Sequence, residues 1–493
     1  MEEKLEFGAN RLVHLDLKRA PLKVDFLEKI FPFFREWGAT GLLIEWEDTF
    51  PYSDNLECIG SLNAESKAYS VADIERILKL AENSNLSVIP LVQTFGHLEF
   101  VLRHEEWKQL REVWKYTNAL CPSNPKSLSL VTSMIDQVIS KMPKDLQYFH
   151  IGADEVWQLG SCSFCSSQDK HVVLLEHLVS VLKHFKENYP HIRPIMWDDM
   201  IRTVPASLIQ AHSLSELVDI MVWFYEPAPF FNIPSDLWSK YASIFKKVWI
   251  ASAFKGATGA CQILPVIQHH VSNHEQWLAF IKSSRAEIKG IAITGWSRYD
   301  HFATLCELLP TALPCLAICL SICKQNGYTQ EIYKNVSTSL GYDQVPLLTN
   351  PYPRPQAVAP DLNYPGWKIT TGVEWLANLK GKHMAIISSD QVGAWMNSWQ
   401  LSTGFISPMQ IQGIVSTLFN IGEEWEALET YMKDHLSEAY YQPQIEEWIA
   451  THCKPLKGKA KELHKSGHEY ISAQLGTESL QLPTQFFPTP RPI

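Results

Sequence analysis

The sequence has no run of about 18 consecutive apolar residues, the length that a membrane-spanning helix needs. Its first residues include Glu2, Glu3 and Glu6, and the apolar stretch typical of a secretory signal does not follow them. We therefore expect no membrane partner and a location inside the cell, in the cytoplasm and nucleus.

An excess of positive charge is also missing, because the net charge is −10 and the acidic residues are spread along the chain without blocks. This balance argues against a polyanionic partner, so we expect no nucleic-acid binding. Apolar residues make up 46% of the 493 positions, which is typical of a folded globular protein. The length predicts one large core with an appended region.

The ten cysteines lack the spacing of a recognisable metal site. Cys162 and Cys165 form a C-x-x-C pair, but no second pair or histidine cluster with zinc-ligand spacing accompanies it. We interpret the two as free thiols in a reducing compartment, with a metal or redox site as the alternative. A glycine-rich phosphate loop and a nucleotide fingerprint are missing too. We therefore expect no cofactor and no metal.

Up to residue 325, short runs of β-branched or aromatic residues alternate with longer stretches of helical periodicity. This alternation predicts repeated βα units and a parallel sheet. Ser70 with Asp73, and Asn124 before Pro125, predict the starts of two of the helices. The runs expected to form strands are Arg11–Leu17, Gly41–Glu47, Leu86–Thr94, Leu146–Gly152, Arg193–Asp198, Val218–Tyr225, Lys247–Ala253 and Gly290–Trp296.

Eight βα units close naturally into a barrel, so the predicted fold is an α/β protein with a TIM (β/α)8 barrel and a mainly helical C-terminal region. The expected divisions are a lead-in over residues 1–10, the barrel over 11–325, a proline-rich linker over 326–366, the helical region over 367–481 and a disordered tail over 482–493. The helical region either caps the barrel or forms a homodimer, and the sequence does not separate these alternatives.

A pair of adjacent acids follows the fourth predicted strand, at the end of a barrel strand where such folds place their functional groups. Asp154 and Glu155 come directly after small residues, which let a ligand approach the backbone closely. A carboxyl group there can donate a proton and then take one back, as general acid catalysis requires. The same pair can also simply cap the next helix, so it is not decisive alone.

Tryptophans stand at the ends of three other predicted strands: Trp197, Trp223 and Trp296. An aromatic plane can pack against the apolar face of a sugar ring, so together they predict a sugar pocket. Further acids at strand ends either bind hydroxyl groups or pair with Arg11, Arg19, Lys255 or Arg298, and we favour pairing. These acids are Glu45, Glu47, Asp48, Asp198, Asp199 and Glu226.

The heptapeptide from His150 to Val156 reads H-I-G-A-D-E-V and resembles the H-x-G-G-D-E motif of glycoside hydrolase family 20, the β-N-acetylhexosaminidases. Ala153 replaces the second glycine of that motif. The resemblance covers roughly residues 8–325 and is nearest to the short intracellular members of the family, which lack an additional N-terminal domain.

Two other segments match the family. Arg11, Asp16 and Arg19 match its R-x-x-x-x-D-x-x-R pattern on the first strand, where the leading arginine binds sugar hydroxyls. Gly96 and His97 match its G-H pair after the third strand. The resemblance therefore implies that Arg11 and His97 contact the substrate, beside the three tryptophans.

The resemblance implies an exo-acting, retaining β-N-acetylhexosaminidase that removes terminal non-reducing N-acetylgalactosamine or N-acetylglucosamine. The substrate's own 2-acetamido oxygen would attack the anomeric carbon, with Glu155 as proton donor and Asp154 orienting the acetamido group. The implied partner is an oligosaccharide or glycoconjugate with a terminal β-linked N-acetylhexosamine.

The chain departs from the family pattern after its last two strands. The family's tyrosine after the seventh strand is missing from the segment Ser252–Thr258, so we expect Tyr225 or Tyr299 to supply the hydroxyl that holds the acetamido oxygen. After the eighth strand the family has W-x-E, whereas this chain has Trp296-Ser297-Arg298, with Asp300 as the nearest acid.

The lost glutamate normally reads hydroxyls 4 and 6 of the sugar, so the gluco or galacto preference stays open, with a lean toward N-acetylgalactosamine from the resemblance. Two alternatives remain for the function. One is a sugar-binding barrel without activity, and the other is a β-glycosidase with separate acid and nucleophile carboxylates.

Overall fold

The computed structural model describes residues 6–60, 69–284, 287–345 and 362–475. The chain divides into two compact units, of which the first comprises Met1–Val373 and His435–Glu447 and the second Glu374–Asp434 and Trp448–Ile493. The tail predicted over residues 482–493 lies outside the described residues, as do residues 346–361 of the predicted linker.

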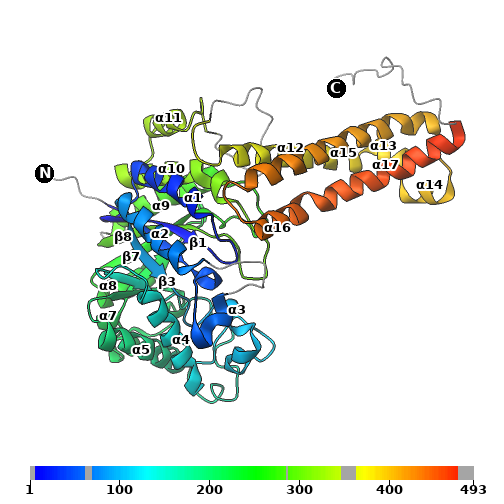
Figure 1. Ribbon diagram of the computed structural model, residues 1–493. Coiled ribbons are helices and arrows are strands. Elements are labelled where there is room, and N and C mark those ends of the chain that lie inside the picture. Colours follow the sequence, from blue (N-terminus) through cyan, green and yellow to red (C-terminus); the bar gives the residue numbers. More distant parts are fainter. Residues whose placement is uncertain (1–5, 61–68, 285–286, 346–361, 476–493) are drawn as a thin grey trace. The chain divides into compact units, whose positions relative to one another are not determined.

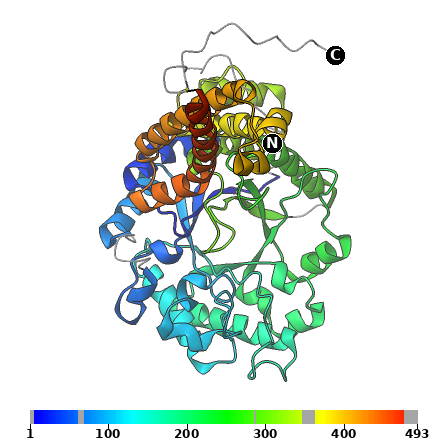
Figure 2. The same cartoon turned by 90° about the vertical axis from the view of Figure 1, so that its right-hand side faces the viewer.

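The strands of the first unit form a closed, parallel barrel in chain order, in which β8 pairs with β1 (Figures 1 and 2). This confirms the predicted TIM barrel, and each observed strand begins within two residues of its predicted start. The strands are β1 (Asn10–Asp16), β2 (Gly41–Glu45), β3 (Ser87–Leu91), β4 (Tyr148–His150), β5 (Arg193–Trp197), β6 (Asp219–Trp223), β7 (Val248–Lys255) and β8 (Ile288–Gly295).

The barrel interior is filled by side chains and is not a pore. Leu12, Leu43, Ile89, Ile195 and Trp249 belong to one buried cluster that spans several strands. Such strands are buried on both faces, which is why each reads as a continuous apolar run in the sequence. A ligand can therefore enter only above this packed core.

Helices surround the strands (Figures 1 and 2). Their apolar stripes are buried, as Phe26, Leu27, Ile30 and Phe34 of the first helix show. Both predicted helix starts are confirmed, because Ser70 and Asp73 form a reciprocal capping box and Asn124 caps a helix that begins with Pro125. The α-helices up to residue 339 are α1 (Val24–Trp37), α2 (Val71–Asn83), α3 (Glu99–Leu102), α4 (Pro125–Ile139), α5 (Lys170–Asn188), α6 (Ala206–Ala211), α7 (Leu214–Leu217), α8 (Ser235–Ile244), α9 (Ile267–Ser284), α10 (Leu309–Gln325) and α11 (Gln330–Ser339).

The later part of the chain is helical, as the sequence predicts. The second unit has an apolar core of its own, to which Met396, Ile411, Ile414, Leu418 and Ile471 belong. The helices from residue 367 onward are α12 (Trp367–Ile387), α13 (Asp390–Trp395), α14 (Ser398–Thr403), α15 (Pro408–Leu436), α16 (Gln442–His452) and α17 (Lys454–Leu475).

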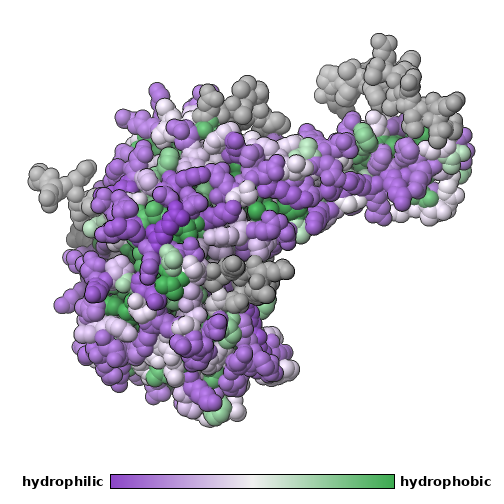
Figure 3. Space-filling model, in the orientation of Figure 1, coloured by the Kyte–Doolittle hydropathy of each residue, from purple (hydrophilic) through white to green (hydrophobic). Residues whose placement is uncertain are grey.

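The surface in Figure 3 is mostly hydrophilic, with hydrophobic residues in small, separated patches. Among the helices that the structure describes, none combines the length and apolarity required to span a bilayer.

Candidate active site

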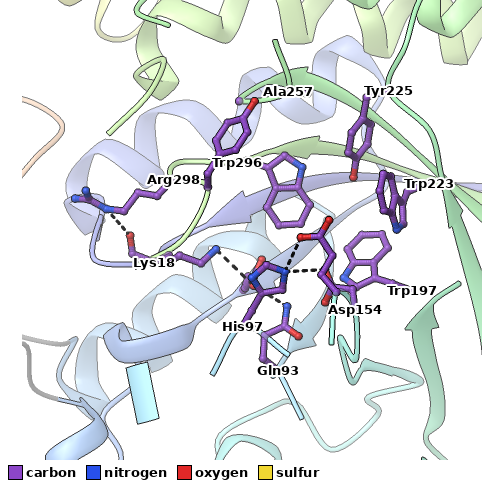
Figure 4. Close-up of a pocket in the computed structure, with 14 residues that line it drawn as sticks. Lys18, Gln93, His97, Asp154, Trp197, Trp223, Tyr225, Ala257, Trp296 and Arg298 are labelled. Atoms are coloured by element: carbon purple, nitrogen blue, oxygen red, sulfur yellow. Dashed lines mark hydrogen bonds and ion pairs between the residues drawn. The ribbon is translucent and has the colours of Figure 1, made fainter. Parts of the chain in front are cut away.

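A pocket of about 220 Å³ opens at the carboxyl ends of the barrel strands (Figure 4). Its lining combines acids, bases and aromatic rings from most of the strands: Lys18, Glu45, Gln93, His97, Asp154, Glu155, Trp197, Trp223, Tyr225, Gly256, Ala257, Trp296, Arg298 and Tyr299. The structure thus brings together eight of the ten site residues predicted from the sequence. Arg11 and Asp300 are not among the lining residues.

The backbone after β4 turns sharply to carry the two adjacent acids into the pocket. Gly152, Ala153 and Glu155 have φ angles of +61°, +69° and +51°, in the left-handed region that L-residues rarely adopt. Ala153 occupies the position where the family motif has glycine, and the backbone conformation explains that glycine. At Gly152 a Cβ atom would approach the Gln93 side-chain oxygen to 2.0 Å, so a larger residue would displace the Gln93 side chain.

His97 contacts both acids. Its Nε2 atom lies 3.4 Å from Asp154 Oδ2 and 3.3 Å from Glu155 Oε2. Burial opposes a charge on the imidazole, but the two carboxylates outweigh it and raise the pKa of His97 well above its ordinary value. The preceding Gly96 passes so close to Asp154 that a Cβ atom would lie 2.0 Å from the carbonyl oxygen. Gly96 is therefore required because a side chain has no room there, and His97 because its charge stabilises both carboxylates.

Asp199 lies behind the pair and was not among the predicted site residues. Its Oδ2 accepts a hydrogen bond from the Glu155 backbone N–H at 2.9 Å, and its Oδ1 accepts one from Trp223 Nε1 at 3.4 Å. Burial, together with the Asp154 carboxylate, raises the pKa of Asp199 to about 7. Asp199 therefore positions the strained turn and one aromatic wall at the same time.

Aromatic side chains form the walls of the pocket (Figure 4). The Trp197 and Trp296 rings lie 6.0 Å apart, and the Trp223 and Tyr225 rings stack at 5.4 Å. Burial raises the pKa of Tyr225, so its hydroxyl stays protonated. Tyr299 is 44% exposed, and its hydroxyl accepts a hydrogen bond from the Gly259 N–H at 3.0 Å.

A buried charge network contributes to the pocket lining, and its Lys18 was not singled out from the sequence. Lys18 Nζ is 3.4 Å from Asp16 Oδ2 and 3.9 Å from Glu45 Oε1, and Gln93 donates to the same Glu45 oxygen at 3.2 Å. Burial alone would lower the pKa of Lys18, but the carboxylates of Asp16 and Glu45 outweigh it and raise that pKa. The sequence could have indicated Lys18 as a pocket residue, because it lies inside the matched R-x-x-x-x-D-x-x-R segment.

The structure does not place Arg11, predicted to contact the substrate, among the residues that line the pocket. Arg11 is the second residue of β1, about 16 Å along the strand from the carboxyl end where the pocket opens. Its Nε donates to the Gly38 carbonyl at 2.7 Å. The arginine therefore serves the opposite end of the barrel.

Asp300 is also absent from the lining of the pocket. Its Oδ1 accepts hydrogen bonds from the backbone N–H groups of Phe302 at 2.7 Å and Ala303 at 2.8 Å. The carboxylate is thus used to close a local turn, the common role of an aspartate at such a position.

Most of the other strand-end acids are paired, but with partners that the sequence did not indicate. Asp198 receives two hydrogen bonds from Arg202, each 2.8 Å long. Glu47 and Asp48 lie 2.9 and 3.5 Å from the two ring nitrogens of His301. Their burial and pairing give them a structural role around the pocket.

A closed barrel whose mouth holds two adjacent carboxylates between tryptophan walls is the architecture of a barrel enzyme that acts on sugars. The family model described as "Glycosyl hydrolase family 20, catalytic domain" matches residues 26–228. Human hexosaminidase D is 37% identical over 455 residues, which cover 90% of this chain and 91% of that protein. Bovine hexosaminidase D is 44% identical over 339 residues, 67% of this chain and 96% of that protein.

The chain belongs to glycoside hydrolase family 20 and is a glycoside hydrolase of the β-N-acetylhexosaminidase class. A solved β-N-acetylhexosaminidase from Bacteroides fragilis NCTC 9343 is similar with a TM-score of 0.49 and 15% identity, covering 67% of this chain and 70% of that one.

Proposed function

We propose that the protein is an exo-acting, retaining β-N-acetylhexosaminidase in which the substrate's 2-acetamido group acts as the nucleophile. The observation that carries this proposal is the contact of both Asp154 and Glu155 with the same nitrogen of His97. Both carboxylates therefore belong to one side of the pocket, where one can serve the leaving group and the other the acetamido group.

An ordinary retaining glycosidase needs two carboxylates that flank the anomeric carbon, one as acid and one as nucleophile. The only other acid that lines the described pocket is Glu45, which is fully buried. Its Oε1 accepts a hydrogen bond from the Gln93 amide and lies 3.9 Å from Lys18 Nζ. Its Oε2 lies 3.1 Å from His14 Nε2. A carboxylate with these partners is poorly suited to attack a sugar, which favours a nucleophile supplied by the substrate.

In the first step, the acetamido carbonyl oxygen bonds to the anomeric carbon while the bond from that carbon to the leaving oxygen breaks. Glu155 gives its proton to the leaving oxygen. Asp154 accepts a hydrogen bond from the acetamido N–H, which orients the group and balances the positive charge of the oxazolinium ring that forms.

In the second step, water attacks the anomeric carbon, and Glu155 takes one of its protons. The bond between the anomeric carbon and the acetamido oxygen breaks, which restores the acetamido group and the protonated acid. Two inversions at the same carbon leave its configuration unchanged, so the product is the β-anomer.

Tyr225 is our candidate for the hydroxyl that holds the acetamido oxygen. It lines the pocket beside Trp223, and its raised pKa keeps the hydroxyl a proton donor at neutral pH. The Tyr299 hydroxyl accepts the Gly259 N–H and keeps its own proton free, but Tyr299 is half-exposed to solvent. Tyr225 therefore has the better environment for this role.

The proposed substrate is an oligosaccharide or glycoconjugate that ends in β-linked N-acetylgalactosamine, with N-acetylglucosamine as the second choice. Where the family has a glutamate for hydroxyls 4 and 6, this chain has Arg298, whose guanidinium is bound to Glu447. A pocket without that carboxylate has lost one means of selecting an equatorial hydroxyl 4. We also propose a location in the cytoplasm and nucleus, which the ten free cysteines support.

Glu155→Gln tests the assignment, because glutamine cannot donate the proton. We expect kcat on a chromogenic β-N-acetylgalactosaminide to fall by about 10²–10⁴-fold, with the fold unchanged by circular dichroism. Asp154→Asn should lower kcat by about 10²–10³-fold through loss of acetamido orientation. The matched control is Asp300→Asn, an acid near the same barrel mouth that closes a turn and should leave kcat unchanged.

Three substrates and one inhibitor separate the alternatives. We expect hydrolysis of the N-acetylgalactosaminide and the N-acetylglucosaminide, inhibition by a thiazoline analogue of the oxazolinium, and no hydrolysis of a plain β-glucoside. Equal hydrolysis of the β-glucoside would refute substrate assistance. Thiazoline binding with no turnover of any hexosaminide would identify a sugar-binding barrel instead.

A further inference from the structure

Four potential metal ligands meet at a place separate from the pocket lining: Glu112, Cys121, Cys162 and Cys165. The Cys121 sulfur lies 3.4 Å from the Cys162 sulfur and 3.8 Å from the Cys165 sulfur. All four ligand atoms lie within 4.8 Å of one another. The C-x-x-C pair, interpreted from the sequence as two free thiols, thus gains a third cysteine and a carboxylate.

The separations between the sulfur atoms match a shared cation. Two thiolates bound to zinc at about 2.3 Å in a tetrahedron lie roughly 3.8 Å apart. A disulfide would require about 2.05 Å between the sulfurs. The distances of Cys121 to its two neighbours therefore lie near the first value and far from the second.

Glu112 provides an independent indication of a cation. Its side chain is only 2% exposed, and its Oε1 accepts hydrogen bonds from the N–H groups of Ser161 at 2.7 Å and Cys162 at 3.1 Å. Its Oε2 is buried and has no hydrogen-bond partner in the structure. A buried carboxylate oxygen without a partner is costly, and a bound cation would satisfy it.

We propose that Cys121, Cys162, Cys165 and Glu112 bind one structural zinc ion. Three thiolates select a soft or borderline cation and exclude calcium and magnesium, which prefer oxygen. An iron–sulfur cluster commonly takes four cysteines, one more than this group holds. Four protein ligands close the coordination sphere, so the ion holds the fold together and does not bind substrate.

The ligands come from the two loops that also carry the central residues of the pocket. Glu112 and Cys121 follow β3 and His97, whereas Cys162 and Cys165 follow β4 and the Asp154-Glu155 pair. A hydrogen bond of 2.9 Å from Asn118 to Gln158 joins the same loops. Zinc would therefore fasten the His97 loop to the acid loop; this consequence, unlike the metal site itself, rests on the proposed function.

The test uses the full-length protein, purified under reducing conditions and dialysed against a weak chelator. Elemental analysis should find about one zinc per chain. Cobalt added in its place should produce the thiolate charge-transfer and tetrahedral d–d absorption bands. Cys121→Ser should remove both signals, whereas Cys261→Ser, which changes an exposed cysteine outside the group, should keep them.

Glu112→Gln guards against a variant that fails to fold, because it keeps all three sulfurs and nearly the same shape. It should weaken zinc binding by at least about 10-fold while the circular dichroism spectrum is retained. A strong chelator should lower the melting temperature of the native protein and of Cys261→Ser but not that of Cys121→Ser.

Failure to retain zinc in the native protein, or equal zinc content in Cys121→Ser, would overturn the proposal. A Cys121–Cys162 disulfide found by mass spectrometry in the untreated protein would overturn it as well. Zinc content is measured independently of hydrolysis. A failure of the zinc proposal can therefore be distinguished from a failure of the proposed hydrolase activity.

Discussion

At the residue scale, Ala153 occupies a backbone conformation that suits glycine. Its φ angle of +69° places the Cβ against its own backbone, which costs an L-residue about 1–2 kcal/mol. The family motif has glycine at this position, so this chain carries strain immediately before its two acids. The structure therefore shows the energetic cost of a departure that the sequence could only record.

Ala153→Gly should relieve this strain. Part of the gain is offset because glycine has more freedom in the unfolded chain, so we expect an increase of about 0.5–1 kcal/mol in the free energy of unfolding. Urea denaturation measures it, and kcat should stay within about twofold, since the Asp154 and Glu155 side chains are unchanged. Destabilisation by more than about 1 kcal/mol would show that the methyl group packs usefully.

Asp199 makes a prediction about pH. In the folded protein its pKa is about 7, whereas an aspartate in an unfolded chain ionises near about 3.9. Between these values the native state keeps a proton that the unfolded state has lost. The contribution of Asp199 to the free energy of unfolding therefore falls as the pH rises from about 4 to about 7, and then levels off.

Asp199→Asn removes this titration and can still accept the Glu155 N–H. Urea denaturation of both proteins across this pH range isolates the effect as a difference. The variant should gain stability relative to the native protein as the pH rises. A difference that does not vary with pH would show that Asp199 ionises normally.

At the element scale, the turn after β8 is tied to the middle of α16. Arg298 is 1% exposed, and its guanidinium donates to the Glu447 carboxylate at 2.6 Å and to the Ala303 carbonyl at 2.7 Å. The neighbouring Trp296 and Tyr299 line the pocket. This ion pair therefore determines how one wall of the pocket is held.

Glu447→Gln leaves the buried guanidinium without its counter-charge. We expect a loss of about 3–5 kcal/mol in the free energy of unfolding, because an unpaired buried charge is strongly destabilising. The loosened wall should raise KM more than it lowers kcat. Glu446→Gln is the matched control on the same helix, since Glu446 only accepts an exposed hydrogen bond from Gln442 and should cost less than about 0.5 kcal/mol.

At the scale of the whole molecule, the two units have separate apolar cores, one inside the barrel and one among the later helices. Units with their own cores commonly unfold in separate transitions. The pocket lining belongs entirely to the first unit. Stability of the second unit and hydrolysis should therefore respond to different substitutions.

Leu418→Ala tests this separation. Leu418 is fully buried in the core of the second unit, so the substitution should cost about 2–5 kcal/mol there. Calorimetry should find two transitions, of which the variant lowers only one, and hydrolysis below that transition should be unchanged. Ile195→Ala in the barrel core is the matched variant and should lower the other transition. A single cooperative transition would contradict the prediction.

The sequence by itself determined the barrel, because buried parallel strands appear as short continuous apolar runs and the helices between them as longer stretches of helical periodicity. It also placed the two acids, His97 and the tryptophans at strand ends, which a barrel necessarily gathers at one mouth. Lys18 was missed, and Asp199 was expected to pair with a basic residue, because the roles of both depend on which distant groups bury them.

Only the tertiary structure decided which polar residues reach the pocket and which pair elsewhere. Arg11 and Asp300 match the expected pattern, yet the first lies at the far end of its strand and the second closes a turn. Cys121 meets Cys165 although 44 positions separate them. Contacts between residues far apart in the chain leave no local periodicity in a single sequence. The partners of the acid turn, the charge network and the cysteine group are therefore visible only in the folded structure.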